Sequence, residues 1–215
     1  MARSRRRPDG VAILVAGSRG SGKSGWTIQQ TEGEPRLLVW DSVGEWSRAG
    51  VVRPAPTLEQ LHSLIINDLA APGPLRVGYT GRISDVHFEG FCRLAMVWMK
   101  VAPGSVAVEE LADVTSPGKA PDGWGELIRK GRHYGGSIYA LTQRPAESDK
   151  TIAGNADIIH TGRLSFPRDR KTMAEYLDVP VQKITALPSL HYIERDMRTR
   201  ALRTGVLSFP TRRKA

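Results

Sequence analysis

The sequence has few of the residues that mark secreted, membrane-spanning or metal-clustering proteins. Its 215 residues include a single cysteine, Cys92, so no disulfide can form within the chain and an intracellular setting is expected. The 5 histidines do not stand at metal-ligand spacing, which argues against a zinc site. No apolar run approaches the roughly 18 residues of a membrane-spanning helix. We therefore expect a soluble protein without a transmembrane segment.

Acidic residues are also in deficit. Asp and Glu total 22 against 31 Lys and Arg, which gives a formal net charge of +9. Such an excess is typical of proteins that bind a polyanion, most commonly nucleic acid, although a generally basic soluble protein shows the same charge. Much of the excess lies in runs at the two ends. The sequence therefore predicts a basic N-terminal arm over residues 1–10, a folded domain over 11–209 and a basic C-terminal tail over 210–215.

One stretch carries a specific chemical signature. Residues 17–24 fit the phosphate-loop pattern G-x-x-x-x-G-K-[ST], between the apolar segment 11–16, typical of a buried strand, and a segment that can continue as a helix. Glycines let successive backbone N–H groups surround an anion, and a helix start adds partial positive charge. The predicted cofactor-binding residues here are Gly17, Ser18, Arg19, Gly20, Ser21, Gly22, Lys23 and Ser24. Lys23 would contact the β- and γ-phosphates of ATP, and Ser24 would ligate Mg²⁺.

A second informative stretch is the apolar strand expected over residues 105–108, which ends in Glu109 and Glu110. ATP-hydrolysing P-loop proteins need two acids at such a strand end. One holds Mg²⁺, directly or through water, and the other polarises the attacking water. Two acids after a strand are weak support alone, but the phosphate loop upstream makes them informative.

The remaining pattern alternates strands and helices. Further strands are expected over residues 36–41, 75–79, 138–142 and 157–160, helices over about 57–69, 85–101 and 168–177, and an antiparallel pair over 192–195 and 202–209. The fold class is therefore α/β, a mostly parallel central sheet flanked by helices, with a C-terminal antiparallel strand pair. Asp41 ends the second strand, where ligands gather in open α/β sheets, so it is a candidate cofactor contact. A capping aspartate is the alternative.

Four motifs follow one another in a characteristic order. They are residues 17–24, Leu38–Asp41 with Gly44-Glu45, Val106–Glu110, and Arg129–Arg132 leading to Leu141-Thr142-Gln143-Arg144-Pro145. This order resembles the FtsK–HerA superfamily of DNA-pumping ATPases over roughly residues 11–165. A basic helix leading to a strand that ends in Thr-Gln-Arg-Pro is much rarer than a phosphate loop. The chain looks most like the genome-packaging ATPases of tailless, membrane-containing viruses, because the related filamentous-phage assembly ATPases normally carry a membrane segment.

The resemblance implies a RecA-like domain that assembles into a homo-oligomeric ring, a hexamer, with ATP between subunits and double-stranded DNA in the central channel. By this analogy Glu109 is the metal-site acid, standing where aspartate is usual, and Glu110 is the catalytic base. Gln143 would sense the γ-phosphate. Arg132, or else Arg129, would be the arginine finger that acts on a neighbour's nucleotide, and a surface helix charge is the alternative for both.

DNA contact is expected in the loop of residues 115–123, with Lys119 as the candidate, because the family's channel loops follow strand ends; a surface loop without a ligand is the alternative. Such contacts would go to phosphates and ignore sequence. The resemblance also implies capsid-vertex or viral membrane proteins as partners, and a location in the host cytoplasm or at the packaging vertex. A small-molecule or nucleoside kinase, a nucleotide-switched assembly protein and a filamentous-phage-type assembly ATPase are the competing functions.

Overall fold

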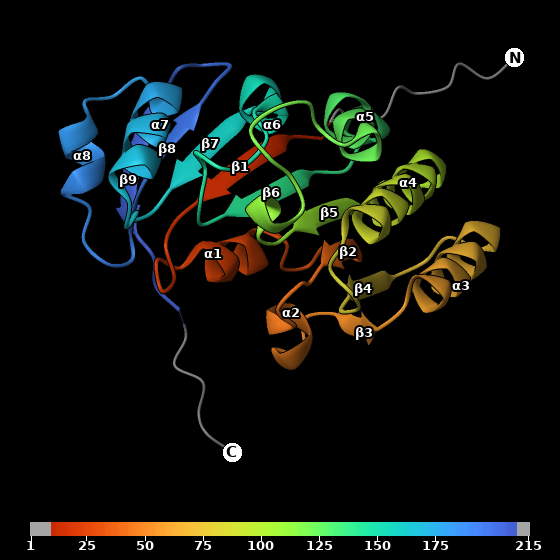
Figure 1. Ribbon diagram of the computed structural model, residues 1–215. Helices are drawn as coiled ribbons and strands as arrows, with labels where there is room; N and C mark the ends of the chain where they lie inside the picture. The colour runs from red at the N-terminus through yellow and green to blue at the C-terminus, as the bar shows by residue number, and fades with distance from the viewer. Residues whose placement is uncertain (1–9, 210–215) are drawn as a thin grey trace, which may run out of the picture.

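A single nine-stranded sheet organises residues 10–209, the part of the chain that the computed structural model describes (Figure 1). Its order is β3-β4-β2-β5-β6-β1-β7-β8-β9. The strands are β1 (Ala12–Ala16), β2 (Arg36–Trp40), β3 (Arg53–Ala55), β4 (Leu75–Tyr79), β5 (Ser105–Val108), β6 (Ile138–Thr142), β7 (Ile158–Thr161), β8 (His191–Asp196) and β9 (Leu202–Val206). From β3 to β7 in this order neighbouring strands are parallel, and β8 and β9 continue the sheet as an antiparallel pair.

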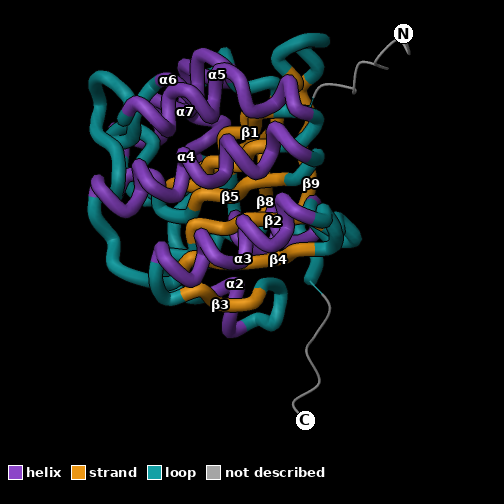
Figure 2. Tube along the Cα trace, turned by 90° about the vertical axis from the view of Figure 1, so that its right-hand side faces the viewer, coloured by secondary structure: helices purple, strands orange, loops and turns teal. Residues whose placement is uncertain are grey.

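Helices cover both faces of the sheet. They are α1 (Lys23–Gln30), α2 (Glu45–Arg48), α3 (Leu58–Ala70), α4 (Asp85–Val101), α5 (Asp122–Lys130), α6 (Thr151–Asn155), α7 (Pro167–Leu177) and α8 (Val181–Thr185), with 3₁₀ turns at Leu111–Asp113 and Gly131–Tyr134. Figure 2 shows α3, α4 and α5 in front of the strands. The opposite face is covered by α1 and α2, whose Trp26 and Trp46 are buried in a second core.

The alternation of side chains along β1 explains how one short strand serves both cores. Ala12, Leu14 and Ala16 belong to the larger core, and Ile13 and Val15 to the smaller one. Successive side chains of a strand point to opposite faces, so a strand between two helical layers must be apolar at every position. This is why the segment before the phosphate loop is a continuous apolar run.

The helices of the larger layer begin at capping residues. The hydroxyl of Thr57 accepts a hydrogen bond from the backbone N–H of Gln60 at the start of α3. Ser84 does the same for His87 at the start of α4. Each cap satisfies a backbone donor that the first turn leaves free, which typically contributes about 1 kcal/mol.

Parallel strands bring the functional segments to one edge of the sheet. β5, β6 and β1 are neighbours, and their carboxyl ends lead into Glu109, Gln143 and the phosphate loop respectively. In open α/β sheets ligands bind at this edge, where the strand order changes direction. Three motifs far apart in the sequence therefore meet around one site.

The fold class predicted from the sequence is confirmed. The terminal pair ends earlier than expected, because β9 stops at Val206 and residues 207–209 leave the sheet. The short edge strand β3 was not predicted. The proposed tail, and the arm apart from Gly10, lie outside the described residues. Among the helices of residues 10–209, none combines the length and apolarity that crossing a membrane requires.

Candidate nucleotide-binding site

The phosphate loop has the backbone conformation that anion binding needs. Gly20 and Gly22 have φ values of 75° and 92°, a region that favours glycine, and Gly22 is the N-cap of α1. Neighbouring strand ends anchor the loop, because the backbone N–H of Gly17 donates to Thr142 O over 3.1 Å and that of Ser18 to Arg163 O over 2.8 Å. The loop is therefore held open above the start of α1.

A pocket of about 830 Å³ lies over this loop. It is lined by Ser18, Arg19, Gly20, Gly22, Lys23, Ser24, Gly25, Val43, Glu45, Arg48, Glu110, Gln143, Leu190 and Phe209. The volume lies within the range of small-molecule and cofactor sites, roughly 300–1,000 Å³. Of the predicted catalytic residues, Lys23, Glu110 and Gln143 reach the pocket, whereas Arg129 and Arg132 do not.

Glu110 connects the phosphate loop to the end of β6. Its Oε1 is 2.8 Å from Lys23 Nζ and accepts a hydrogen bond from Gln143 Nε2 over 2.6 Å. Glu110 has φ 49° and ψ 57°, a left-handed backbone conformation that costs a non-glycine residue energy and is concentrated at functional sites. This conformation places the carboxylate directly after β5, in the pocket beside the phosphate loop.

Glu109 does not line the pocket but is hydrogen-bonded to Ser24 of the phosphate loop. Its Oε1 accepts a hydrogen bond from Ser24 Oγ over 2.5 Å, and the residue is 1% exposed. Burial raises its pKa to about 7, and the charge of Glu45 adds to this effect, whereas the Ser24 hydrogen bond, the charge of Lys23 and the nearby Trp46 indole lower the pKa. The other oxygen, Oε2, is buried and has no hydrogen-bond partner among the described residues.

The unpartnered oxygen of Glu109, beside the Ser24 hydroxyl, fits a Mg²⁺ ion. Mg²⁺ in nucleotide sites takes one or two oxygens from the protein and completes its shell with waters and substrate phosphates. No group of three or more acidic, histidine or cysteine side chains in residues 10–209 could hold a metal ion. The donor set therefore suits an ion whose remaining ligands come from nucleotide phosphates and water.

Asp41 supports the pocket from behind. It is fully buried, and its carboxylate accepts hydrogen bonds from the backbone N–H groups of Trp46 and Ser47 and from the Ser47 hydroxyl. These bonds fix the start of α2, which presents Glu45 and other side chains to the pocket. The structure thus gives Asp41 the capping role that the sequence had left as the alternative to direct cofactor contact.

An apolar wall closes one side of the pocket and was not predicted from the sequence. Leu190 and Phe209 line it, and Gln29 of α1 holds the segment by donating to Ser208 O over 2.8 Å. A Cβ atom at Gly25 would lie 2.6 Å from Phe209 Cε1, so a larger residue at this position of α1 would displace the Phe209 ring. The apolar alternation of the C-terminal residues signals burial but does not indicate which helix they cover.

The remaining predicted residues lie away from the pocket. Arg132 pairs with Asp157 over 3.0 Å at the opposite edge of the sheet, where the Asp157 carboxylate also accepts from the N–H of Ala12. Arg129 is exposed and makes no hydrogen bond or ion pair through its side chain within residues 10–209. Lys119 pairs with the exposed Asp122 over 3.0 Å. The arginine-finger and DNA-contact roles remain predictions.

Comparison with known proteins identifies relatives of this chain. No family model matches the sequence. The chain is 37% identical over 182 residues to protein P9 of Pseudoalteromonas phage PM2, a match that covers 84% of this chain and 81% of the relative. The genome packaging NTPase B204 of Sulfolobus turreted icosahedral virus 2, in complex with ATP-gammaS, has a similar fold, with a TM-score of 0.73 at 17% identity over 90% of this chain and 96% of that chain. VirB4 of Thermoanaerobacter pseudethanolicus has a TM-score of 0.62 at 8% identity over 92% of this chain and 89% of that chain.

The two structures have a similar fold, and the phage protein is similar in sequence over most of both chains. The phosphate loop, the acidic strand end and Gln143 all stand at the same edge of the sheet. The chain therefore belongs to the family of protein P9 of Pseudoalteromonas phage PM2, and its fold and its relatives fit the resemblance to the FtsK–HerA superfamily.

Proposed function

We propose that this protein is an ATP-driven motor that moves double-stranded DNA, and that this DNA is a viral genome entering its capsid. The observation that carries the proposal is the carboxylate oxygen of Glu110 that both Lys23 and Gln143 contact. The contact joins a phosphate-binding lysine, an acid able to activate water and an amide able to contact the γ-phosphate. The fold shared with a genome packaging NTPase and the kinship with a phage protein support the same function.

In this mechanism the phosphate loop binds the nucleotide through its backbone N–H groups, and Lys23 neutralises phosphate charge. An ammonium group has three donors, so Lys23 can hold Glu110 and a phosphate oxygen together. Glu110 accepts the proton of the attacking water. Ser24 and Glu109 would hold Mg²⁺, which supplies positive charge to the phosphates. Gln143 would lose its bond to Glu110 when it turns to the γ-phosphate, and its movement would report the nucleotide state.

The assembly we propose is a homo-oligomeric ring, a hexamer, in which each nucleotide lies between two subunits. Arg129 is the better placed arginine finger, because its side chain is exposed and has no ion-pair partner in residues 10–209, whereas Arg132 is held by Asp157. The ring would work in the host cytoplasm or at the packaging vertex, where capsid-vertex or viral membrane proteins would dock it.

A nucleoside or small-molecule kinase is the main competing function. A kinase transfers the phosphoryl group to a substrate hydroxyl and excludes water, so an acid that activates water is of no use to it. Glu110 is linked to Gln143 at the end of a neighbouring strand, which suits sensing and hydrolysis better than transfer to a second substrate.

The test is the steady-state ATPase rate with and without long double-stranded DNA, at low and moderate salt, with Glu110→Gln in parallel. We expect DNA to raise the rate several-fold, added salt to remove the increase, and the variant to hydrolyse at least about 10²-fold more slowly. Turnover that ignores DNA would refute the motor function. Hydrolysis slower than subunit exchange would favour a nucleotide-switched assembly protein, and ADP production that depends on an added hydroxyl substrate would favour a kinase.

A further inference from the structure

Residues 163–171 form the loop after β7 and the start of α7, and they carry a dense positive charge. It contains Arg163, Arg168, Arg170 and Lys171, and its one acid is Asp169. Asp169 is fully buried and pairs with Arg144, which lies outside the segment, so it does not pair with the segment's exposed cations. We call residues 163–171 the basic segment.

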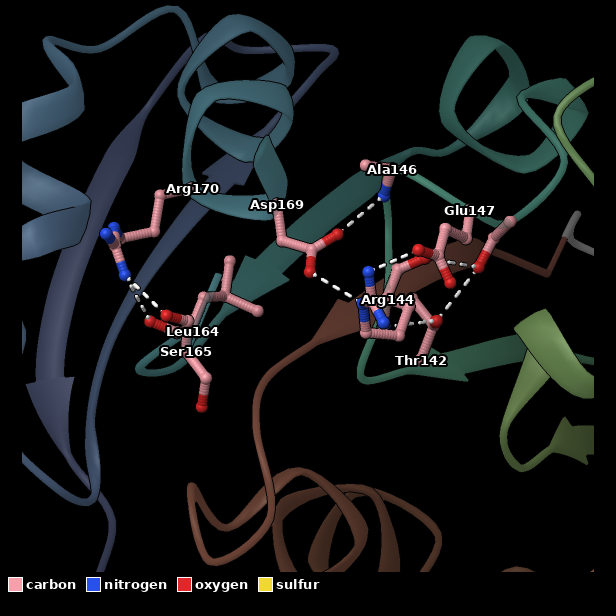
Figure 3. A network of polar contacts seen from close by, with 9 residues as sticks. Thr142, Arg144, Ala146, Glu147, Leu164, Ser165, Asp169 and Arg170 are labelled. Atoms are coloured by element: carbon pink, nitrogen blue, oxygen red, sulfur yellow. Dashed lines mark hydrogen bonds and ion pairs between the residues drawn. The ribbon is translucent and has the colours of Figure 1, made fainter. Parts of the chain in front are cut away.

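The cations of this segment differ in what they contact. Arg170 donates from Nη1 to the carbonyl oxygens of Leu164 and Ser165, and so holds the loop in shape (Figure 3). Arg163, Arg168 and Lys171 are exposed, and their side chains make no hydrogen bond or ion pair within the described part of the chain. Three cations are therefore available to a ligand from one short segment.

The basic segment contacts both the phosphate loop and the loop that follows Gln143. Ser18 of the phosphate loop donates to the carbonyl oxygen of Arg163 from both its N–H and its hydroxyl. Asp169 accepts from Arg144 Nε and from the N–H of Ala146, each over 3.0 Å, and Figure 3 shows its carboxylate pointing between them. Arg144 and Ala146 belong to residues 143–146, which we call the sensor loop, so hydrogen bonds hold the sensor loop and the basic segment together.

An aromatic contact reinforces this connection. The guanidinium of Arg144 lies 4.3 Å from the ring centre of Phe166, which is half exposed on the basic segment. Arg144 is therefore held by a buried carboxylate and an aromatic face at once, and a shift of the loop after Gln143 would be transmitted to the start of α7.

We propose that the basic segment binds the phosphate backbone of double-stranded DNA, and that its attachment to the sensor loop couples this grip to the nucleotide. The inference rests on the proposed function. Exposed arginine and lysine side chains and the positive end of α7 provide the charge that a DNA backbone requires, without any sequence preference. The loop of residues 115–123 is less suitable, because its one cation, Lys119, already pairs with Asp122.

A second basic region offers a matched control. The β8–β9 hairpin carries Arg200 and Arg203, both exposed, at the edge of the sheet opposite the nucleotide. Here Met197 N donates to Asp157 O beside the start of β1 and β7, and no contact among the described residues joins the hairpin tip to the phosphate loop. Charge removed from this hairpin changes net charge equally but leaves the basic segment intact.

The experiment compares the full-length wild-type protein with Arg168→Gln/Lys171→Gln and with Arg200→Gln/Arg203→Gln. Affinity for a long double-stranded DNA is measured by fluorescence anisotropy over a salt series, alongside ATPase rates with and without this DNA. For the basic-segment variant we expect weaker binding, a salt slope reduced by about 0.9 for each lost phosphate contact, no DNA stimulation, and an unchanged rate without DNA. The hairpin variant should match the wild type.

Three results would overturn the inference while the wild-type protein remains stimulated by DNA. The first is unchanged DNA affinity and stimulation in the basic-segment variant. The second is a loss of affinity confined to the hairpin variant, which would place DNA at the other edge. The third is a lower ATPase rate without DNA in the basic-segment variant, which would indicate a contact with a neighbouring subunit's nucleotide. A wild-type protein that neither binds nor responds to DNA would overturn the proposed function, and this inference with it.

Discussion

Replacing Glu109 with glutamine should stabilise the protein in the absence of metal, although it damages the active site. Glu109 is buried, and its pKa is raised from 4.5 to about 7. Below pH 4.5 the folded and unfolded states both carry the proton. Between pH 4.5 and 7 only the folded state keeps it, so stability falls as the pH rises, and above pH 7 the full penalty applies. Glutamine does not ionise and can still accept the hydrogen bond of Ser24.

The size of the effect follows from the two pKa values. Each pKa unit corresponds to about 1.36 kcal/mol, so a rise from 4.5 to about 7 amounts to about 3 kcal/mol at pH 8 and about 1 kcal/mol at pH 5. The assay is urea unfolding at 25 °C in EDTA at both pH values. We expect Glu109→Gln to exceed the wild type in free energy of unfolding by these amounts. With Mg²⁺ and nucleotide present, the order should reverse, because only the wild type keeps the Glu109 carboxylate as a metal ligand.

Glu59→Gln is a control of opposite sign. Its carboxylate lies in the first turn of α3, where hydrogen bonds from its own backbone N–H and from Thr57 lower its pKa. The stability that Glu59 contributes is therefore present above pH 4.5 and is lost as the pH falls below it, so the difference between Glu59→Gln and the wild type should be nearly the same at pH 8 and pH 5 and should shrink below pH 4.5. If Glu109→Gln and the wild type differed equally at the two pH values, the buried, proton-binding state inferred for Glu109 would be wrong.

Three further substitutions, one of them with a matched control, test the account of the site and its surroundings. Gln143→Ala should lower kcat by about 10²-fold with little change in the KM for ATP. A rise in KM as large as the fall in kcat would contradict a sensor role. Gly22→Ala should abolish nucleotide binding in a calorimetric titration, because its Cβ would lie 2.6 Å from a side-chain atom of the C-terminal segment. Gly33→Ala is the control: it has a φ of 80° but open space around it, so it should lose only about 1 kcal/mol in free energy of unfolding. Arg132→Gln should lose about 1–2 kcal/mol of stability, because it leaves Asp157 with one guanidinium fewer, and keep its kcat. A large loss of kcat that is restored by mixing with Glu110→Gln subunits would instead make Arg132 the finger.

The parts of the site that the sequence predicted are local patterns. The phosphate loop, the acidic strand end and Gln143 each follow an apolar strand, and parallel strands bring their carboxyl ends to one edge. Their convergence could therefore be expected. The sharing of a single Glu110 oxygen by Lys23 and Gln143 could not, because it depends on the left-handed backbone of Glu110.

The features that the sequence missed depend on contacts between distant residues. Arg132 and Asp157 are 25 positions apart, and nothing local marks either as the other's partner. The same holds for the hydrogen bond between Arg144 and Asp169 and for the packing of Phe209 beside Gly25. The edge strand β3 escaped prediction because three residues that include Pro54 form no strand pattern, although an edge strand tolerates proline.

The central claim is that hydrolysis at this site moves the protein along double-stranded DNA, and displacement of a triplex tests it most directly. A labelled third strand is bound to one end of a long duplex, and its release is followed with ATP, with a non-hydrolysable analogue, and with Glu110→Gln. The account predicts release by the wild-type protein with ATP alone, after a delay that grows with the length of duplex ahead of the triplex. Release without hydrolysis, or no release under conditions where DNA stimulates the ATPase, would contradict it.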